Sequence, residues 1–166
     1  MFGSFHPLER TYIMTFSSDI KEFAEKTNRN IEDVRANAAI KIFGDIVKAT
    51  PVGHSKWWAP VNGKPAKAPP GYTGGRLRGN WQTSLNSTID STIANIDANG
   101  SETINKMTAV VAVAKGEDTI FMTNNLPYAV PVEYGHSKKQ RPMGMMRVSI
   151  TGWNNAIKAA LQKVDK

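Results

Sequence analysis

The chain contains no cysteine among its 166 residues. This absence excludes disulfide bonds, thiolate nucleophiles and zinc sites with sulfur ligands. No apolar run approaches the roughly 18 residues that a membrane-spanning helix requires, so we expect no membrane partner. Residues 1–13 include His, Pro, Glu and Arg where a secretory signal would be apolar, so we expect no signal peptide.

Acidic residues are missing from two long stretches, 46–89 and 134–164, although the chain carries a net charge of +7. The acids gather instead in 19–45 and 90–118. Such segregation fits either nucleic acid or an acidic face on a neighbouring subunit, and solubility alone also explains it. The bases in the two acid-free stretches are Lys48, Lys56, Lys64, Lys67, Arg76 and Arg78, then Lys138, Lys139, Arg141, Arg147, Lys158 and Lys163.

Apolar residues recur every three or four positions over Ser18–Ala49, which predicts an amphipathic helix ended by Pro51. Asp19 and Glu22 resemble a capping box at its start. The segment 28–30 leaves open one long helix or two helices with a bend. We expect residues 1–17 to form an irregular N-terminal extension, and residues 18–164 a single domain.

The segment 51–75 holds five of the nine prolines and five glycines, together with Trp57 and Trp58, which predicts a long loop inserted in the domain. A loop of this length in a compact domain is uncommon and is often functional. We expect it to pack against a neighbouring subunit. Burial of the tryptophan pair in the core and binding to nucleic acid are the alternatives.

Strands are predicted over Leu77–Thr88, Thr103–Lys115 and Thr119–Thr123, the last two joined as a hairpin. The segment 87–98 fits a continued strand better than a short helix. A short helical turn over Pro127–Tyr134 and a C-terminal helix over Met146–Val164 complete the pattern. The predicted fold is therefore an α+β domain, with a long N-terminal helix and a C-terminal helix packed on an antiparallel sheet.

Catalytic chemistry has little support in this sequence. Three histidines without converging ligands make a metal centre improbable, and no nucleotide-binding loop is present, so no cofactor is expected. Glu133, His136 and Ser137 can be written as a hydrolytic triad, but triads normally draw their members from separated loops. We expect Glu133 to pair with an arginine or to cap backbone amides.

A nucleic-acid-binding module is the main alternative to a protein interface. Cations and stackable aromatic residues interleave in two neighbouring segments, and a basic run follows later, yet no known nucleic-acid-binding motif accompanies them. Tryptophan and arginine also anchor protein interfaces. The residues concerned are Lys56, Trp57, Trp58, Arg76, Arg78 and Trp81, with the run Lys138, Lys139 and Arg141.

Two motifs together resemble a family of long-tailed bacteriophage proteins described as minor tail components, neck proteins or tail-completion proteins. The first is Arg76–Trp81, preceded by Ala49–Val52 and by Thr73-Gly74. The second motif consists of Asn124–Ala129, Glu133–Ser137 and the closing residues Pro142, Gly144 and Met145. The similarity runs from about Ser18 to Val164. The chain departs from the family in Gly53–Tyr72, which separates two halves that usually lie nearly contiguous.

The resemblance implies a non-enzymatic virion protein that forms a ring at the head–tail junction and is assembled in the host cytoplasm. A hexameric ring is favoured, and a dodecamer is the alternative. The implied partners are a connector or head-closure protein, a tail-tube or tail-terminator protein, and genome DNA that passes through the channel without sequence-specific binding. The expected interface residues are Trp57, Trp58, Arg76, Arg78, Trp81, Tyr128, Glu133, Tyr134, His136, Lys138, Lys139 and Arg141.

Overall fold

The computed structural model describes residues 7–58, 60–135 and 143–164, with the side chains of 7–20, 22, 29 and 57 excluded. Helices dominate it. Their order along the chain, with a 3₁₀ turn η1 and two strands, is α1 (Pro7–Ala49), η1 (Ser55–Trp57), α2 (Arg76–Gly79), β1 (Gln82–Leu85), α3 (Ser101–Ala112), β2 (Ile120–Thr123), α4 (Ala129–Glu133), α5 (Met146–Ile150) and α6 (Trp153–Val164).

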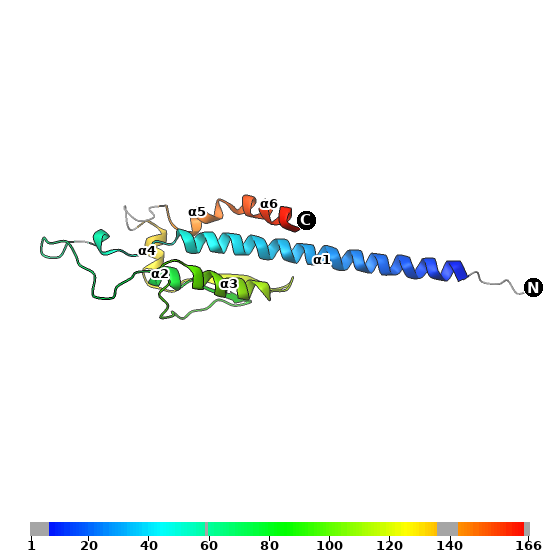
Figure 1. The fold of residues 1–166 in the computed structure, drawn as a ribbon, viewed down its shortest axis with the longest axis horizontal. Coiled ribbons are helices and arrows are strands. Elements are labelled where there is room, and N and C mark those ends of the chain that lie inside the picture. Colours follow the sequence, from blue (N-terminus) through cyan, green and yellow to red (C-terminus); the bar gives the residue numbers. More distant parts are fainter. Residues whose placement is uncertain (1–6, 59, 136–142, 165–166) are drawn as a thin grey trace, which may run out of the picture.

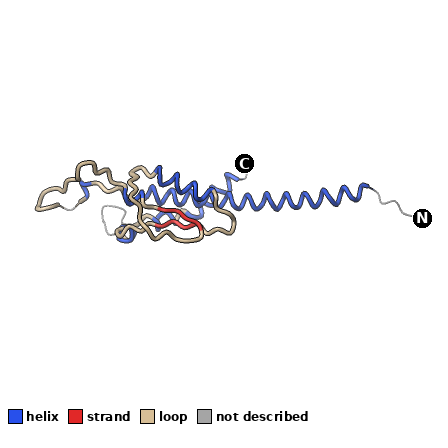
Figure 2. The backbone as a smooth tube through the Cα atoms, turned by 90° about the horizontal axis from the view of Figure 1, so that it is seen from below, coloured by secondary structure: helices blue, strands red, loops and turns tan. Residues whose placement is uncertain are grey.

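The body of the protein is built around the C-terminal half of α1 (Figure 1). Helices α5 and α6 lie along one side of α1, and α3 with the strands lies along the other. Strands β1 and β2 pair antiparallel, with Gln82 opposite Thr123 and Leu85 opposite Ile120. This arrangement confirms the α+β class, although the sheet has only two strands in the described part of the chain (Figure 2).

Helix α1 is one continuous helix of 43 residues, without a bend at 28–30. It begins at Pro7, so the prediction of an irregular segment is wrong for residues 7–17, while residues 1–6 lie outside the described part of the chain. The predicted capping box at Asp19 is also wrong, because Asp19 lies inside the helix. Proline suits a helix start because its fixed φ is helical and its missing N–H has no partner to lose there. The side chains of the body half, among them Ile42, Ile46 and Val47, are buried in the main core.

The N-terminal half of α1 extends away from the body as a single helix (Figures 1 and 2). We call Pro7–Ile31 the arm; at 1.5 Å per residue it is roughly 37 Å long. The body begins at Glu32 and Arg35, where the Arg35 guanidinium donates to the Gly116 and Asp118 carbonyls at 2.9 Å. Glu32 accepts from the Gly116 amide at 3.0 Å. The apolar stripe continues into the arm, but Phe23 and Ile31 there are 69% and 62% exposed.

Residues 101–112 form helix α3, so the predicted strand over Thr103–Lys115 was wrong. The β-branched residues of this segment favour strand, but burial follows a helical spacing, with Thr103, Met107 and Val111 facing the core. Tertiary packing thus overrides a weak local propensity. The predicted hairpin with Thr119–Thr123 is also wrong, because β2 pairs with β1.

Three smaller predictions are also corrected. The strand expected over Leu77–Thr88 is limited to β1, because its first residues form α2. Residues 87–98 are irregular rather than extended in a sheet. The C-terminal helix is divided into α5 and α6 around Gly152, whose amide donates to the Ser149 carbonyl at 3.1 Å. The short helix expected near residue 130 is confirmed as α4.

Candidate interface residues

Arg78 and Trp81 meet at the C-terminal end of α1, and both stabilise the body itself. The Arg78 guanidinium donates to the Thr50 carbonyl at 2.6 Å and to the Lys48 carbonyl at 3.2 Å. The last carbonyls of a helix lack partners inside it, and a cation there also complements the helix dipole. Arg78 therefore caps α1 and reaches on to the Ala98 carbonyl at 2.5 Å.

Trp81 is a core residue, only 7% exposed, which corrects its assignment to a subunit interface. Its indole Nε1 donates to the Thr50 hydroxyl at 2.7 Å, and that hydroxyl donates to the Ile46 carbonyl at 2.7 Å. A buried tryptophan needs such a partner for its N–H. The two halves of the first motif, around Thr50 and around Arg78, thus converge in space to close the end of α1.

The second motif is bonded to the first through its asparagines. Asn124 donates its side-chain amide to the Leu77 carbonyl at 2.8 Å, and Leu126 beside it is 4% exposed. Asn125 donates to the carbonyls of Ile89 and Ser91, which holds the irregular segment against the body. These motif residues have structural roles that the sequence did not distinguish from interface roles.

Glu133 caps the N-terminus of α5, one of the two roles expected for it. Its carboxylate accepts from the amides of Met145, Met146 and Arg147 at 2.6, 2.9 and 3.0 Å. The guanidinium of Arg147 also lies 3.4 Å from it. Burial alone would raise the pKa of Glu133, but these hydrogen bonds outweigh it and lower the pKa below its ordinary value. Gly144 permits the approach, because a Cβ there would lie 2.5 Å from the Glu133 carbonyl oxygen.

Asp97 has the corresponding role at α3. Its carboxylate accepts from the Gly100 amide and from both the amide and the hydroxyl of Thr103, each at 2.8 Å. Burial would raise its pKa, but the Thr103 and Gly100 hydrogen bonds, together with the charge of Arg78, lower it. The sequence offers a signal for this cap, an acid shortly before the start of the helix, but the strand predicted over Thr103–Lys115 leaves no helix for Asp97 to cap.

Other expected interface residues lie on the surface. Tyr128 and Tyr134, at the two ends of α4, are 42% and 72% exposed, and Arg147 stacks over the Tyr134 ring at 5.0 Å. Arg76 is also exposed. Partial burial raises the pKa of Tyr128, although the nearby charge of Arg76 acts to lower it. Trp58 is 37% exposed and packs edge-on against Tyr72, with ring centroids 5.0 Å apart.

The expected interface residues do not include several exposed apolar side chains of this region, because the sequence does not show whether an apolar residue of a helix packs inward or faces outward. Val130 shares a face of α4 with Tyr134, and Trp153 begins α6. Among the described residues of 128–135 and 143–153, seven large apolar side chains are exposed, namely Tyr128, Val130, Tyr134, Met143, Val148, Ile150 and Trp153.

Part of the expected interface falls outside the described structure. His136, Lys138, Lys139 and Arg141 lie in residues 136–142, and the side chain of Trp57 is likewise not described. The hydrolytic alternative needs His136 and Ser137 from this segment. The Glu133 carboxylate it also needs is already bonded to three amides and an arginine.

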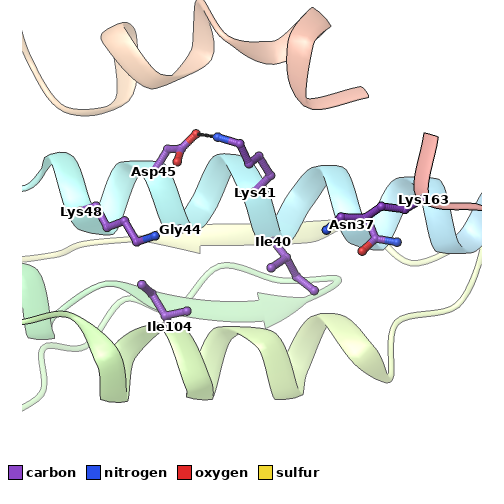
Figure 3. Close-up of a pocket in the computed structure, with 8 residues that line it drawn as sticks. All are labelled: Asn37, Ile40, Lys41, Gly44, Asp45, Lys48, Ile104 and Lys163. Atoms are coloured by element: carbon purple, nitrogen blue, oxygen red, sulfur yellow. Dashed lines mark hydrogen bonds and ion pairs between the residues drawn. The ribbon is translucent and has the colours of Figure 1, made fainter. Parts of the chain in front are cut away.

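One groove of about 230 Å³ lies along α1 between α3 and α6 (Figure 3). Gly44 forms an open notch in its floor, since a Cβ there would meet no atom within 4 Å. Lys41 is paired with Asp45 at the rim. No nucleophile–base pair is among the lining residues, which are Asn37, Ile40, Lys41, Gly44, Asp45, Lys48, Ile104 and Lys163.

The described residues contain no cluster of three or more His, Asp or Glu side chains that could hold a metal ion. Within the same residues, no helix combines the length and the apolar character needed to span a membrane. Comparison of this chain with protein-family models, with curated proteins and with solved structures finds no match.

Proposed function

We propose that this chain is a structural virion subunit without enzymatic activity, which assembles into a ring at the head–tail junction of a long-tailed bacteriophage. In this proposal the ring is a hexamer, with a dodecamer as the alternative. It surrounds the channel for genome DNA and contacts a connector or head-closure protein on one side. On the other side, the ring contacts a tail-tube or tail-terminator protein.

The observation that carries this proposal is the amount of apolar surface that the single chain leaves exposed on regular structure. The arm exposes Phe23 and Ile31, and α4 exposes Val130 and Tyr134. Contiguous exposed apolar surface marks interaction sites. A ring repeats one heterologous interface, which requires two different faces on each subunit, and the arm and the α4–α6 region supply two.

The motif resemblance supports the same function, and the hydrogen bonds between the two motifs give a physical reason for their joint occurrence. Arg78 and Glu133 bond backbone groups at the ends of helices, which lack partners inside the helix. Asn124 joins the second motif to the Leu77 carbonyl of the first. Each of the three therefore supports the fold of the subunit. In this proposal they build the scaffold, while Tyr128, Tyr134 and the arm make the contacts.

Native mass spectrometry and light scattering test the proposal, on the purified chain alone and mixed with the neighbouring virion proteins. We expect a closed ring of defined mass in at least one mixture, because some subunits assemble only on a template. A chain that stays monomeric in every mixture, or an image of the intact virus without this chain at the junction, would contradict the proposal.

A further inference from the structure

The described residues of 54–73, which are all but residue 59, form a loop that leaves the body and returns to it at a single point, and we call this segment the finger. A Cβ added to Gly74 would lie 2.4 Å from the carbonyl oxygen of Gly53. One added to Gly53 would lie 2.4 Å from the Tyr72 hydroxyl oxygen. The two strands of the base are therefore in direct contact, and the finger projects beyond the body at the end opposite the arm (Figure 1).

The finger has a defined tip and a braced base. Asn62 and Gly63 have φ of 52° and 72°, and Val61 and Lys64 exchange backbone hydrogen bonds of 2.9 and 3.0 Å. This is the two-residue Asn-Gly turn that tightly reverses a chain. Nearer the base, the Trp58–Tyr72 ring contact joins the outgoing and returning strands. The proline-rich backbone between them resists collapse, because proline fixes φ.

The charge of the finger is entirely positive. It contains Lys56, Lys64 and Lys67, and the nearest acids in sequence are Asp45 and Asp90. Lys64 and Lys67 are both exposed. Lysine is depleted in the buried centres of protein interfaces but serves as a point charge for phosphate. A projecting element whose exposed charges are all lysines therefore fits a polyanion better than a protein surface.

We propose that the finger contacts the phosphate backbone of double-stranded DNA through Lys64 and Lys67, without reading base sequence. This inference rests on the proposed function for the identity of the polyanion, because the ring encloses genome DNA. A single finger supplies few contacts, since each neutralised phosphate contributes about 0.9 to the salt dependence of binding. Several fingers around one channel multiply that effect.

The test is fluorescence anisotropy of the full chain with a labelled DNA duplex of mixed sequence, over a series of salt concentrations from about 20 to 200 mM, a range in which phosphate contacts dominate affinity. The double variant Lys64→Gln/Lys67→Gln should lower the slope of log K against log salt by about two per bound copy. The matched control, Lys158→Gln/Lys163→Gln, removes the same charge from two exposed positions on α6. It should change the slope much less.

If the salt slope decreases equally in the two variants, net charge alone drives DNA binding, and the inference is overturned. An absence of DNA binding by the unmodified chain at low salt would also overturn it. If the finger variant loses self-association while its DNA slope stays unchanged, the finger contacts a sister copy instead. Ring formation is measured separately by native mass spectrometry. A chain that never assembles but shows the slope change would contradict the proposed ring and would leave DNA binding by the finger supported.

Deletion of the finger supplies a second variant. Joining Gly53 directly to Gly74 spans two residues already in contact, so the melting temperature of the body should stay nearly unchanged. The salt slope should fall at least as far as in the double variant. A well-folded deletion variant that keeps the full slope would contradict the inference.

Discussion

Trp81 combines apolar burial with a satisfied polar group, since its ring lies in the core and its Nε1 bonds to Thr50. We expect Trp81→Ala to lower the free energy of unfolding by about 3–5 kcal/mol. Trp58→Ala, at a partly exposed position, should cost far less, within about 1 kcal/mol. Denaturant unfolding of the two variants measures the difference, and equal losses would contradict the burial described here.

Glu133 and Asp97 give the subunit a predictable response to acid. Both pKa values are lowered in the folded chain, from ordinary values of 4.5 and 3.8. A lowered folded pKa means that the charged form stabilises the fold, fully above the ordinary pKa and progressively less as pH falls through the folded one. The melting temperature should therefore not depend on the ionisation of these groups near neutral pH, and it should fall below about pH 4.5.

The variant Glu133→Gln isolates one part of this acid response. It should melt lower than the parent at pH 7, where the lost carboxylate capped α5, and the difference should narrow toward pH 3. Glu102→Gln is a control, because Glu102 is exposed and forms only an i,i+4 pair with Lys106. If the difference in melting temperature between Glu133→Gln and the parent stays constant across the pH range, the charge of Glu133 is not the stabilising feature.

Residue types alone predicted the role of Glu133 but not those of Arg78 and Trp81. A carboxylate at the end of a short helical turn has few uses besides capping or ion pairing, so chemistry restricts the choice. Arginine and tryptophan serve equally well in cores, caps and interfaces. The contacts of both side chains with Thr50, which is distant in sequence, show that Trp81 lies in the core and that Arg78 bonds the end of α1.

At the scale of elements, α1 is packed along one half and solvated along the other. Helical hydrogen bonds without tertiary support open easily, because helix nucleation and propensity supply little stability alone. Amide hydrogen exchange of the unassembled chain should therefore be fast in the arm before Ile31 and slow over residues 38–48. Uniform slow exchange along α1 in a monomer would contradict this expectation.

Assembly should change that exchange pattern. If the arm is one of the two ring faces, its amides become protected when the ring forms, while those of residues 38–48 change little. The periodicity of the sequence predicted the helix but not its lack of a partner, because an apolar stripe looks the same whether it faces its own core or another subunit.

Helix α3 shows why one element was predicted wrongly. Val110, Val111 and Val113 raise strand propensity, and strand or helix cannot be decided from a short apolar run alone. The decisive contribution is long-range, through packing of Met107 and Val111 on Ala39 of α1 and through the cap formed by Asp97. Such contacts cannot be read from the local sequence.

At the scale of the whole molecule, the exposed face of α4 is predicted to hold subunits together. Val130→Ser should weaken assembly with little change in melting temperature, because Val130 is 63% exposed in the single chain. Val113→Ser, at a position 67% exposed at the end of α3, is the matched control. Native mass spectrometry at several concentrations measures the assembly of both variants. Equal assembly of the two variants would exclude α4 from the interface.

The clamp of Arg35 and Glu32 on the 115–118 turn has a mechanical consequence. These hydrogen bonds hold α1 at the boundary between the arm and the body. A force applied to the N-terminal tip of the arm therefore exerts its largest bending moment at this boundary. The same turn adjoins β2, and its Asp118 bonds Asn86 beside β1. A force applied to the tip of the arm is therefore transmitted into the β1–β2 pair.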